Sequence, residues 1–144
     1  MYRETKPVRS AMKLSHVSIK CSNLKSSIDF YTHAFDAVIA HTFLDKFNNP
    51  YGYFLKLPGG GLIELIQHDG IRKNGECCEG GSSIEHFCIE VNSIEEFLIK
   101  IPNSIISKNV HRGRTDLVLQ AAIVDPNGVI IELHQFDEQA KFRP

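Results

Sequence analysis

The feature that most constrains the fold is a ten-residue stretch that the sequence contains twice. The two copies span residues 15–24 and 85–94 and align without a gap. The pairs that match at this constant offset of 70 residues are His16 with His86, Ile19 with Ile89, and Leu24 with Ile94. A chain that repeats a pattern once at this distance is expected to contain two copies of one structural unit. The short periods of solenoids and propellers do not apply to two units of about 50 residues.

Each copy reads as a strand followed by a helix. Polar and apolar residues alternate over about 13–21 and again over 84–91, as in half-buried strands. Ser22 or Asn23 is expected to cap a first helix, and Ser93-Ile94-Glu95-Glu96 satisfies a capping box that begins a second. Pro102 is expected to end the second helix early.

The rest of the chain predicts three further strands after each helix. The expected strand ranges are 37–45, 51–57 and 62–66, then 105–111, 116–124 and 129–134, with turn signals between them. The fold is therefore predicted to be α+β, with two βαβββ modules forming one curved, incompletely closed eight-stranded sheet around a cleft. A single domain is expected over 13–136, with modules 13–68 and 84–136, an arm at 1–12 and a loose tail at 137–144.

Composition excludes several classes of protein. The 144 residues carry a net charge of −1 with acids and bases interspersed, which argues against a nucleic-acid or anionic-membrane surface. No apolar run approaches the roughly 20 residues that span a bilayer, and residues 1–13 lack the apolar core of a secretory signal. A cytoplasmic protein with reduced cysteines is expected. The Cys77-Cys78 pair lacks CxxC spacing and is read as incidental loop thiols, while Cys88 could at most line a site formed by His86.

Two glutamates repeat along with the histidines. Glu64 and Glu132 each lie within an aliphatic run near the end of their module, 48 and 46 residues after His16 and His86. An ionised Glu in a core strand costs on the order of several kcal/mol unless a cation or donor compensates it. Neutral imidazole and carboxylate are both good ligands for borderline divalent metals. Each residue alone is weak evidence, but the joint repetition predicts one metal site of two histidines and two glutamates.

These motifs resemble the vicinal oxygen chelate superfamily, which includes glyoxalase I, bleomycin-resistance proteins and extradiol dioxygenases. The resemblance covers about residues 13–136. The stretches that carry it are Leu14–Ile19, Ser27–Tyr31, Gly61–Leu65, Ile84–Ile89 and Asp125–Leu133. It implies that each module contributes its first and last strand to one divalent metal, Zn, Ni, Co or Mn, held by His16, Glu64, His86 and Glu132.

The resemblance implies a glyoxalase I type of activity, a lyase or isomerase acting on a small molecule whose neighbouring oxygens bind the metal. Glu132 would be the base that moves a proton and Glu64 its symmetric partner, and a homodimer would be the working unit. Leu65-Ile66-Gln67-His68-Asp69 replaces the Asn-Trp-Gly usual in bacterial glyoxalase I, which argues against glutathione hemithioacetal as the substrate. Open alternatives are an Fe(II) dioxygenase, a metal-dependent thiol transferase for an antibiotic, and a non-catalytic protein that sequesters a ligand.

The remaining polar candidates are weaker. His134 lies two residues beyond Glu132 on the same predicted face, so it could line the pocket or end a strand in solvent. Arg112 and Arg114 could bind an anionic substrate, although a solvated loop is the simpler expectation. Four histidines without a repeat partner are expected to be structural or surface residues: His33, His41, His68 and His111.

Overall fold

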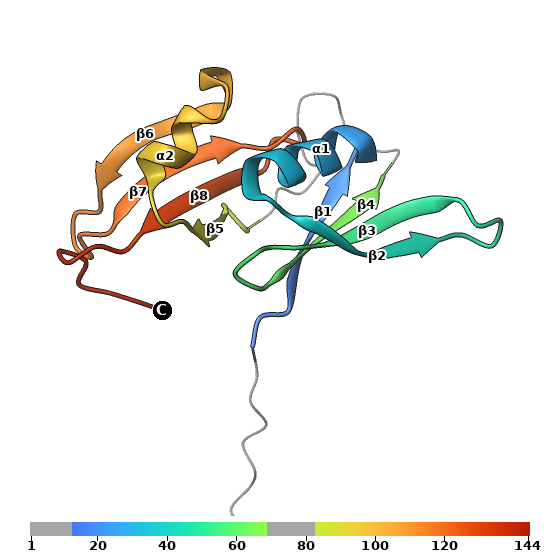
Figure 1. Cartoon of the computed structure of the whole chain (residues 1–144), viewed down its shortest axis with the longest axis horizontal. Coiled ribbons are helices and arrows are strands. Elements are labelled where there is room, and N and C mark those ends of the chain that lie inside the picture. The colour runs from blue at the N-terminus through green and yellow to red at the C-terminus, as the bar shows by residue number, and fades with distance from the viewer. Residues whose placement is uncertain (1–12, 69–82) are drawn as a thin grey trace, which may run out of the picture.

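A computed structural model describes residues 13–68 and 83–144 as two successive βαβββ modules (Figure 1). The first module comprises β1 (His16–Cys21), α1 (Leu24–Phe35), β2 (Val38–Leu44), β3 (Pro50–Lys56) and β4 (Leu62–Gln67). The second comprises β5 (Phe87–Glu90), α2 (Ile94–Ile99), a 3-10 turn (Asn103–Ile105), β6 (Ile106–Arg112), β7 (Leu119–Val124) and β8 (Ile130–Gln135). The predicted α+β class and the repeated βαβββ order are confirmed. The predicted arm and the Cys77-Cys78 pair lie outside the described residues.

The eight strands hydrogen-bond as two four-stranded mixed sheets with the same internal order. The first sheet runs β1-β4-β3-β2 and the second β5-β8-β7-β6. In each sheet the first and last strands of the module are parallel neighbours, and the other pairs are antiparallel. Across the described ranges no strand of one sheet pairs with a strand of the other, so the structure is not closed. The parallel pairs place the repeated His and Glu positions on neighbouring strands.

Both predicted helix starts are confirmed in detail. The side chain of Asn23 accepts a hydrogen bond from the backbone N–H of Ser26 at 3.0 Å, and Ser93 Oγ accepts one from Glu96 N–H at 3.2 Å. The first helix packs on β3 and β4, and the second packs on β6, β7 and β8. None of the helices in the described part of the chain has the length and apolar character needed to cross a membrane.

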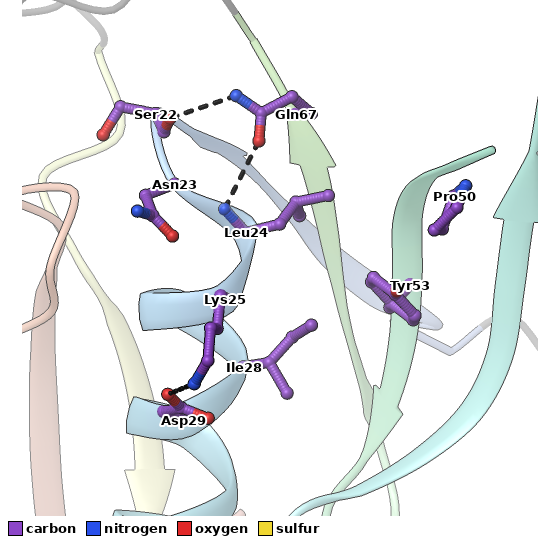
Figure 2. A pocket seen from close by; sticks show the side chains of 9 residues that line it. All are labelled: Ser22, Asn23, Leu24, Lys25, Ile28, Asp29, Pro50, Tyr53 and Gln67. Carbon is purple, nitrogen blue, oxygen red and sulfur yellow. Dashed lines mark hydrogen bonds and ion pairs between the residues drawn. The ribbon is translucent and has the colours of Figure 1, made fainter.

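A glutamine at the end of each module ties the last strand to the start of the helix. Gln67 accepts a hydrogen bond from Leu24 N–H at 3.3 Å and donates one to the carbonyl of Ser22 at 3.0 Å (Figure 2). In the second module, Gln135 accepts from Ile94 N–H at 2.9 Å. These bonds satisfy helix N–H groups that have no partner within the helix. The two glutamines occupy equivalent positions in the repeat Glu-Leu-x-Gln, at 64–67 and 132–135.

The two modules share one hydrophobic core on the helix side of the sheets. Its buried side chains come from both halves of the chain, among them Tyr31, Leu55, Ile63, Leu65, Ile94, Ile123, Ile131 and Leu133. The rings of Phe35 on α1 and Phe97 on α2 lie 5.0 Å apart, so the two helices meet directly. The modules therefore fold as one body rather than as two independent units.

A buried polar cluster joins the modules at the turn between β7 and β8. The Asp125 carboxylate accepts hydrogen bonds from Tyr31 Oη of α1 at 2.9 Å and from the Asn127 and Val129 N–H groups at 2.8 Å each. The Asn127 side-chain amide donates to Asp125 at 3.1 Å and to Ser27 Oγ of α1 at 3.0 Å. This turn, expected only as a chain reversal, is thus the polar contact that fixes α1 against the second module.

We predict that Asp125→Ala destabilises the protein by at least about 3 kcal/mol, because it leaves several buried donors without an acceptor. Tyr31→Phe is the matched milder change and should cost about 2 kcal/mol, since it removes a single bond to a charged group. Urea unfolding at neutral pH measures both. Equal losses for the two variants would contradict the central role given to Asp125.

Stability should also fall at alkaline pH through Tyr31. Burial raises the pKa of this phenol well above its ordinary value, and the Asp125 carboxylate raises it further. The unfolded chain then loses the Tyr31 proton from about pH 10, while the folded chain still holds it. The stabilisation is complete below that pH and declines as the pH rises toward the folded-state pKa. The stability advantage of the unmutated chain over Tyr31→Phe should therefore shrink between about pH 8 and about pH 11.

Candidate metal centre

The first half of the predicted site lies on β1 and β4. His16 Nε2 is 3.9 Å from Glu64 Oε2, and both side chains are partly exposed. In the parallel register Ser18 is the partner of Glu64. His16 lies two residues before Ser18, so its side chain is on the same face of the sheet as that of Glu64. This brings His16 and Glu64 together as predicted, with room for a small group between them.

The second half lies at the equivalent place on β5 and β8, and its histidine–glutamate distance is shorter. His86 Nε2 is 2.9 Å from Glu132 Oε2, and His134 Nε2 is 3.2 Å from the same oxygen. His86 directly precedes β5 instead of lying within it, because the strand begins at Phe87 and not at residue 84 as the sequence predicts. His134 therefore lies beside Glu132 and is largely shielded from solvent, with a side-chain exposure of 16%.

Strand alternation places both halves on the open face of their sheet. Ile63 and Leu65 flank Glu64 and are buried against the helices, and Ile131 and Leu133 do the same around Glu132. Each carboxylate consequently points away from the aliphatic core, with a side-chain exposure of 20% for Glu64 and 21% for Glu132. The free-energy cost of desolvating these two carboxylates is therefore smaller than the cost inferred from the sequence for a core position.

The donor chemistry of these residues fits a divalent cation. Imidazole nitrogens and carboxylate oxygens face each other at short distance on both sheets, and His134 Nε2 is buried without a hydrogen-bond partner. In the described part of the chain, the side chains whose ligand atoms all lie within 4.8 Å of one another are Cys88, Glu132 and His134. The predicted four residues instead stand as two pairs on separate sheets.

Cys88 lies at the centre of the second half, where it is the register partner of Glu132. Burial raises the pKa of its thiol to about 12, with further contributions from the carboxylates of Glu132 and Glu90. Without a cation the thiol is therefore protonated at neutral pH and is a poor nucleophile. Its position exceeds the lining role that the sequence suggested.

Aromatic side chains extend the first half into a wall. The ring centroids of His16 and Phe54 lie 5.3 Å apart, and those of Phe43 and Phe54 lie 4.9 Å apart. The ring of His41 contacts Phe43 at 5.2 Å. Sequence reasoning missed this wall, because the register that aligns Phe54 with Glu64 is not visible in the sequence alone.

Arg112 serves the structure of the chain end. Its guanidinium forms a bidentate pair with Asp137 at 2.7 and 3.0 Å and donates to the Leu117 carbonyl at 2.6 Å. Hydrogen bonding within this pair raises the pKa of Arg112 and lowers that of Asp137. The residue is therefore committed to holding the start of the predicted loose tail, and the suggested anion-binding role does not apply to it.

No family model matches this chain, and no curated protein matches it by sequence. Solved structures do match its fold. FosX, a fosfomycin resistance protein from Listeria monocytogenes, matches with a TM-score of 0.70 and 16% identity, covering 92% of this chain and 100% of that one. FosX has also been solved in complex with Mn(II) and 1S,2S-dihydroxypropylphosphonic acid.

Two further structures broaden the comparison. A glyoxylase/bleomycin resistance protein/dioxygenase domain from Frankia sp. EAN1pec matches with a TM-score of 0.67 and 23% identity, over 89% of this chain and 100% of that one. A glyoxalase I mutant from Zea mays matches with a TM-score of 0.69 and 20% identity, over 88% of this chain and 45% of the maize chain. At these identities the comparisons establish a common fold.

Proposed function

Because the chain has the fold of the vicinal oxygen chelate superfamily, we propose that it is a divalent-metal-dependent enzyme of the glyoxalase I type. It would act as a lyase or isomerase on a small substrate with two neighbouring oxygens. The observation that carries the proposal is the pair of histidine–glutamate contacts, His16–Glu64 and His86–Glu132, at equivalent places on the two sheets. A chance surface pair would not recur on the symmetry-related strands.

His16, Glu64, His86 and Glu132 would hold the metal. A bound divalent cation supplies positive charge to substrate oxygens where negative charge develops. The histidines act as ligands, and their contacts with the carboxylates orient both rings and acids.

Glu132 is the proposed base. Its contacts with His86 and His134 both use Oε2, so among the described residues Oε1 keeps its lone pairs for a proton. The side chain is 21% exposed on the open face of its sheet, where a substrate can reach it. Glu64 occupies the same position on the other sheet. In a site with two-fold symmetry it would be the carboxylate on the opposite side of the substrate.

A homodimer is proposed to bring the two half-sites together. Each half-site opens away from the helices, and the apolar residues two positions before each histidine, Leu14 and Ile84, are 83% and 76% exposed. On the first sheet, Val38 and Ile39 of the edge strand are exposed as well. A second copy that covers these surfaces could place its His86 and Glu132 opposite His16 and Glu64.

The wall formed by Phe43 and Phe54 beside His16 supports a substrate with an apolar portion next to its metal-binding oxygens. A second candidate is a metal-dependent thiol transferase for an antibiotic, favoured by the match to the fosfomycin resistance protein FosX and its Mn(II) complex. Turnover of methylglyoxal plus a thiol, compared with turnover of fosfomycin, separates the two. An unmodified ligand that stays bound would instead favour a sequestering protein.

The dimer proposal predicts complementation between two inactive variants. His16→Ala/Glu64→Ala loses one half-site, and His86→Ala/Glu132→Ala loses the other. Mixed and refolded together, they should regain roughly a quarter of the turnover of the unmutated protein, because only heterodimers contain one complete site each. Steady-state turnover with added metal measures this, and each variant refolded alone is the control. A site formed within one chain would give no recovery.

Glu132→Gln should retain the fold and lower kcat by about 100- to 10,000-fold, because the amide cannot accept the substrate proton. Glu64→Gln is the matched control on the other sheet and should lose less. Circular dichroism checks the fold, and steady-state assays with added Ni, Zn, Mn or Co check turnover. Full activity of Glu132→Gln would remove it as the base, and the absence of binding or stabilisation by any of these metals would refute the enzyme proposal.

A further inference from the structure

The second half-site differs from the first in its number of potential ligands. Beside His86 and Glu132 it contains Cys88 and His134 on the same open face of β5 and β8. At the equivalent repeat positions the first module has Ser18 and Ile66. A serine hydroxyl is a poor ligand for borderline metals and an isoleucine is none, so the second module has two potential ligands that the first module lacks.

The distances in this cluster suit ligands of one ion. Metal–nitrogen and metal–oxygen bonds of about 2.1 Å separate neighbouring ligand atoms by about 3.0 Å at right angles and about 3.4 Å at the tetrahedral angle. Glu132 Oε2 lies 2.9 Å from His86 Nε2 and 3.2 Å from His134 Nε2. The ligand atoms of Cys88, Glu132 and His134 all lie within 4.8 Å of one another, so side-chain adjustment can bring all three around one ion.

His134 gives an independent indication of a missing partner. Its Nε2 is buried and makes no hydrogen bond, although it lies 3.2 Å from the Glu132 carboxylate. A buried ring nitrogen without a partner costs free energy. In the tautomer protonated on Nδ1, this nitrogen presents a lone pair next to the thiol and the carboxylate, which is the orientation that a cation requires.

We propose that Cys88, Glu132 and His134 form a three-donor binding site for a zinc-class transition metal within the second module alone, with Cys88 as a thiolate ligand. The thiol proton leaves to solvent when the sulfur–metal bond forms. The inference rests on the metal of the proposed function but not on its catalysis.

Cobalt(II) tests the assignment, because a thiolate ligand gives a sulfur-to-cobalt charge-transfer band in the near ultraviolet. The full-length chain is used with Cys77→Ser and Cys78→Ser, which leaves Cys88 and the core residue Cys21 as thiols. We expect the band at one cobalt per chain, its loss in Cys88→Ser, and at least a tenfold weaker affinity in His134→Gln. The band should persist in His16→Ala/Glu64→Ala.

Ser18→Ala is the matched control, since Ser18 occupies the repeat position of Cys88 and should leave both band and affinity unchanged. Should Cys88→Ser fail to fold, protection of Cys88 from alkylation by added zinc, read by peptide mass spectrometry on the unmutated chain, gives the same information. Cobalt binding without the band, or binding lost in His16→Ala/Glu64→Ala, would overturn the three-donor site while leaving the proposed function in place. A chain that binds no cobalt at all refutes both.

Discussion

The arrangement of the two modules depends on the buried carboxylate of Asp125. It accepts hydrogen bonds from the backbone of its own turn and from Tyr31 on the helix of the other module. Asn127 adds a bond to Ser27 on the same helix. A buried charge without such partners would cost several kcal/mol, on the order of the whole stability of a small domain. With them, one turn specifies how α1 sits against the second module, and the apolar contact of Phe35 with Phe97 follows from that placement.

This packing decides where the candidate ligands lie. The helices and the shared core occupy one face of each sheet, so the opposite faces remain open, and these faces carry His16 and Glu64 on one side and His86 and Glu132 on the other. The same contact that unites the modules therefore leaves each half-site exposed. A second copy of the chain is the simplest object with the right ligands and the right symmetry to complete them.

Much of the fold and of the candidate site could be predicted from the sequence, because the two modules repeat the same pattern of residues. Strand alternation and helix caps gave the elements in the right order, and the repeated His and Glu positions gave two contacts that the structure contains. Whether those two pairs bind a single metal stays a prediction. The roles of Asp125 and Gln135 could not be read in the same way, since a turn residue and a strand-end amide look alike whether they face solvent or a helix. Their partners, Tyr31 and Ile94, lie 94 and 41 residues away in the chain, and only the folded register brings them together.

The places where the two modules differ are as informative as those where they agree. The turn before the last strand is Pro58-Gly59-Gly60-Gly61 in the first module and Asp125-Pro126-Asn127-Gly128 in the second, and only the second anchors the opposite helix. Beside the repeated histidine and glutamate, the first module has an aromatic wall led by Phe54, while the second has Cys88 and His134. The two modules thus have the same residues where a shared metal would require them, and different residues at the neighbouring positions. One sheet has an aromatic surface beside its histidine, and the other has additional side chains of the types that bind metals.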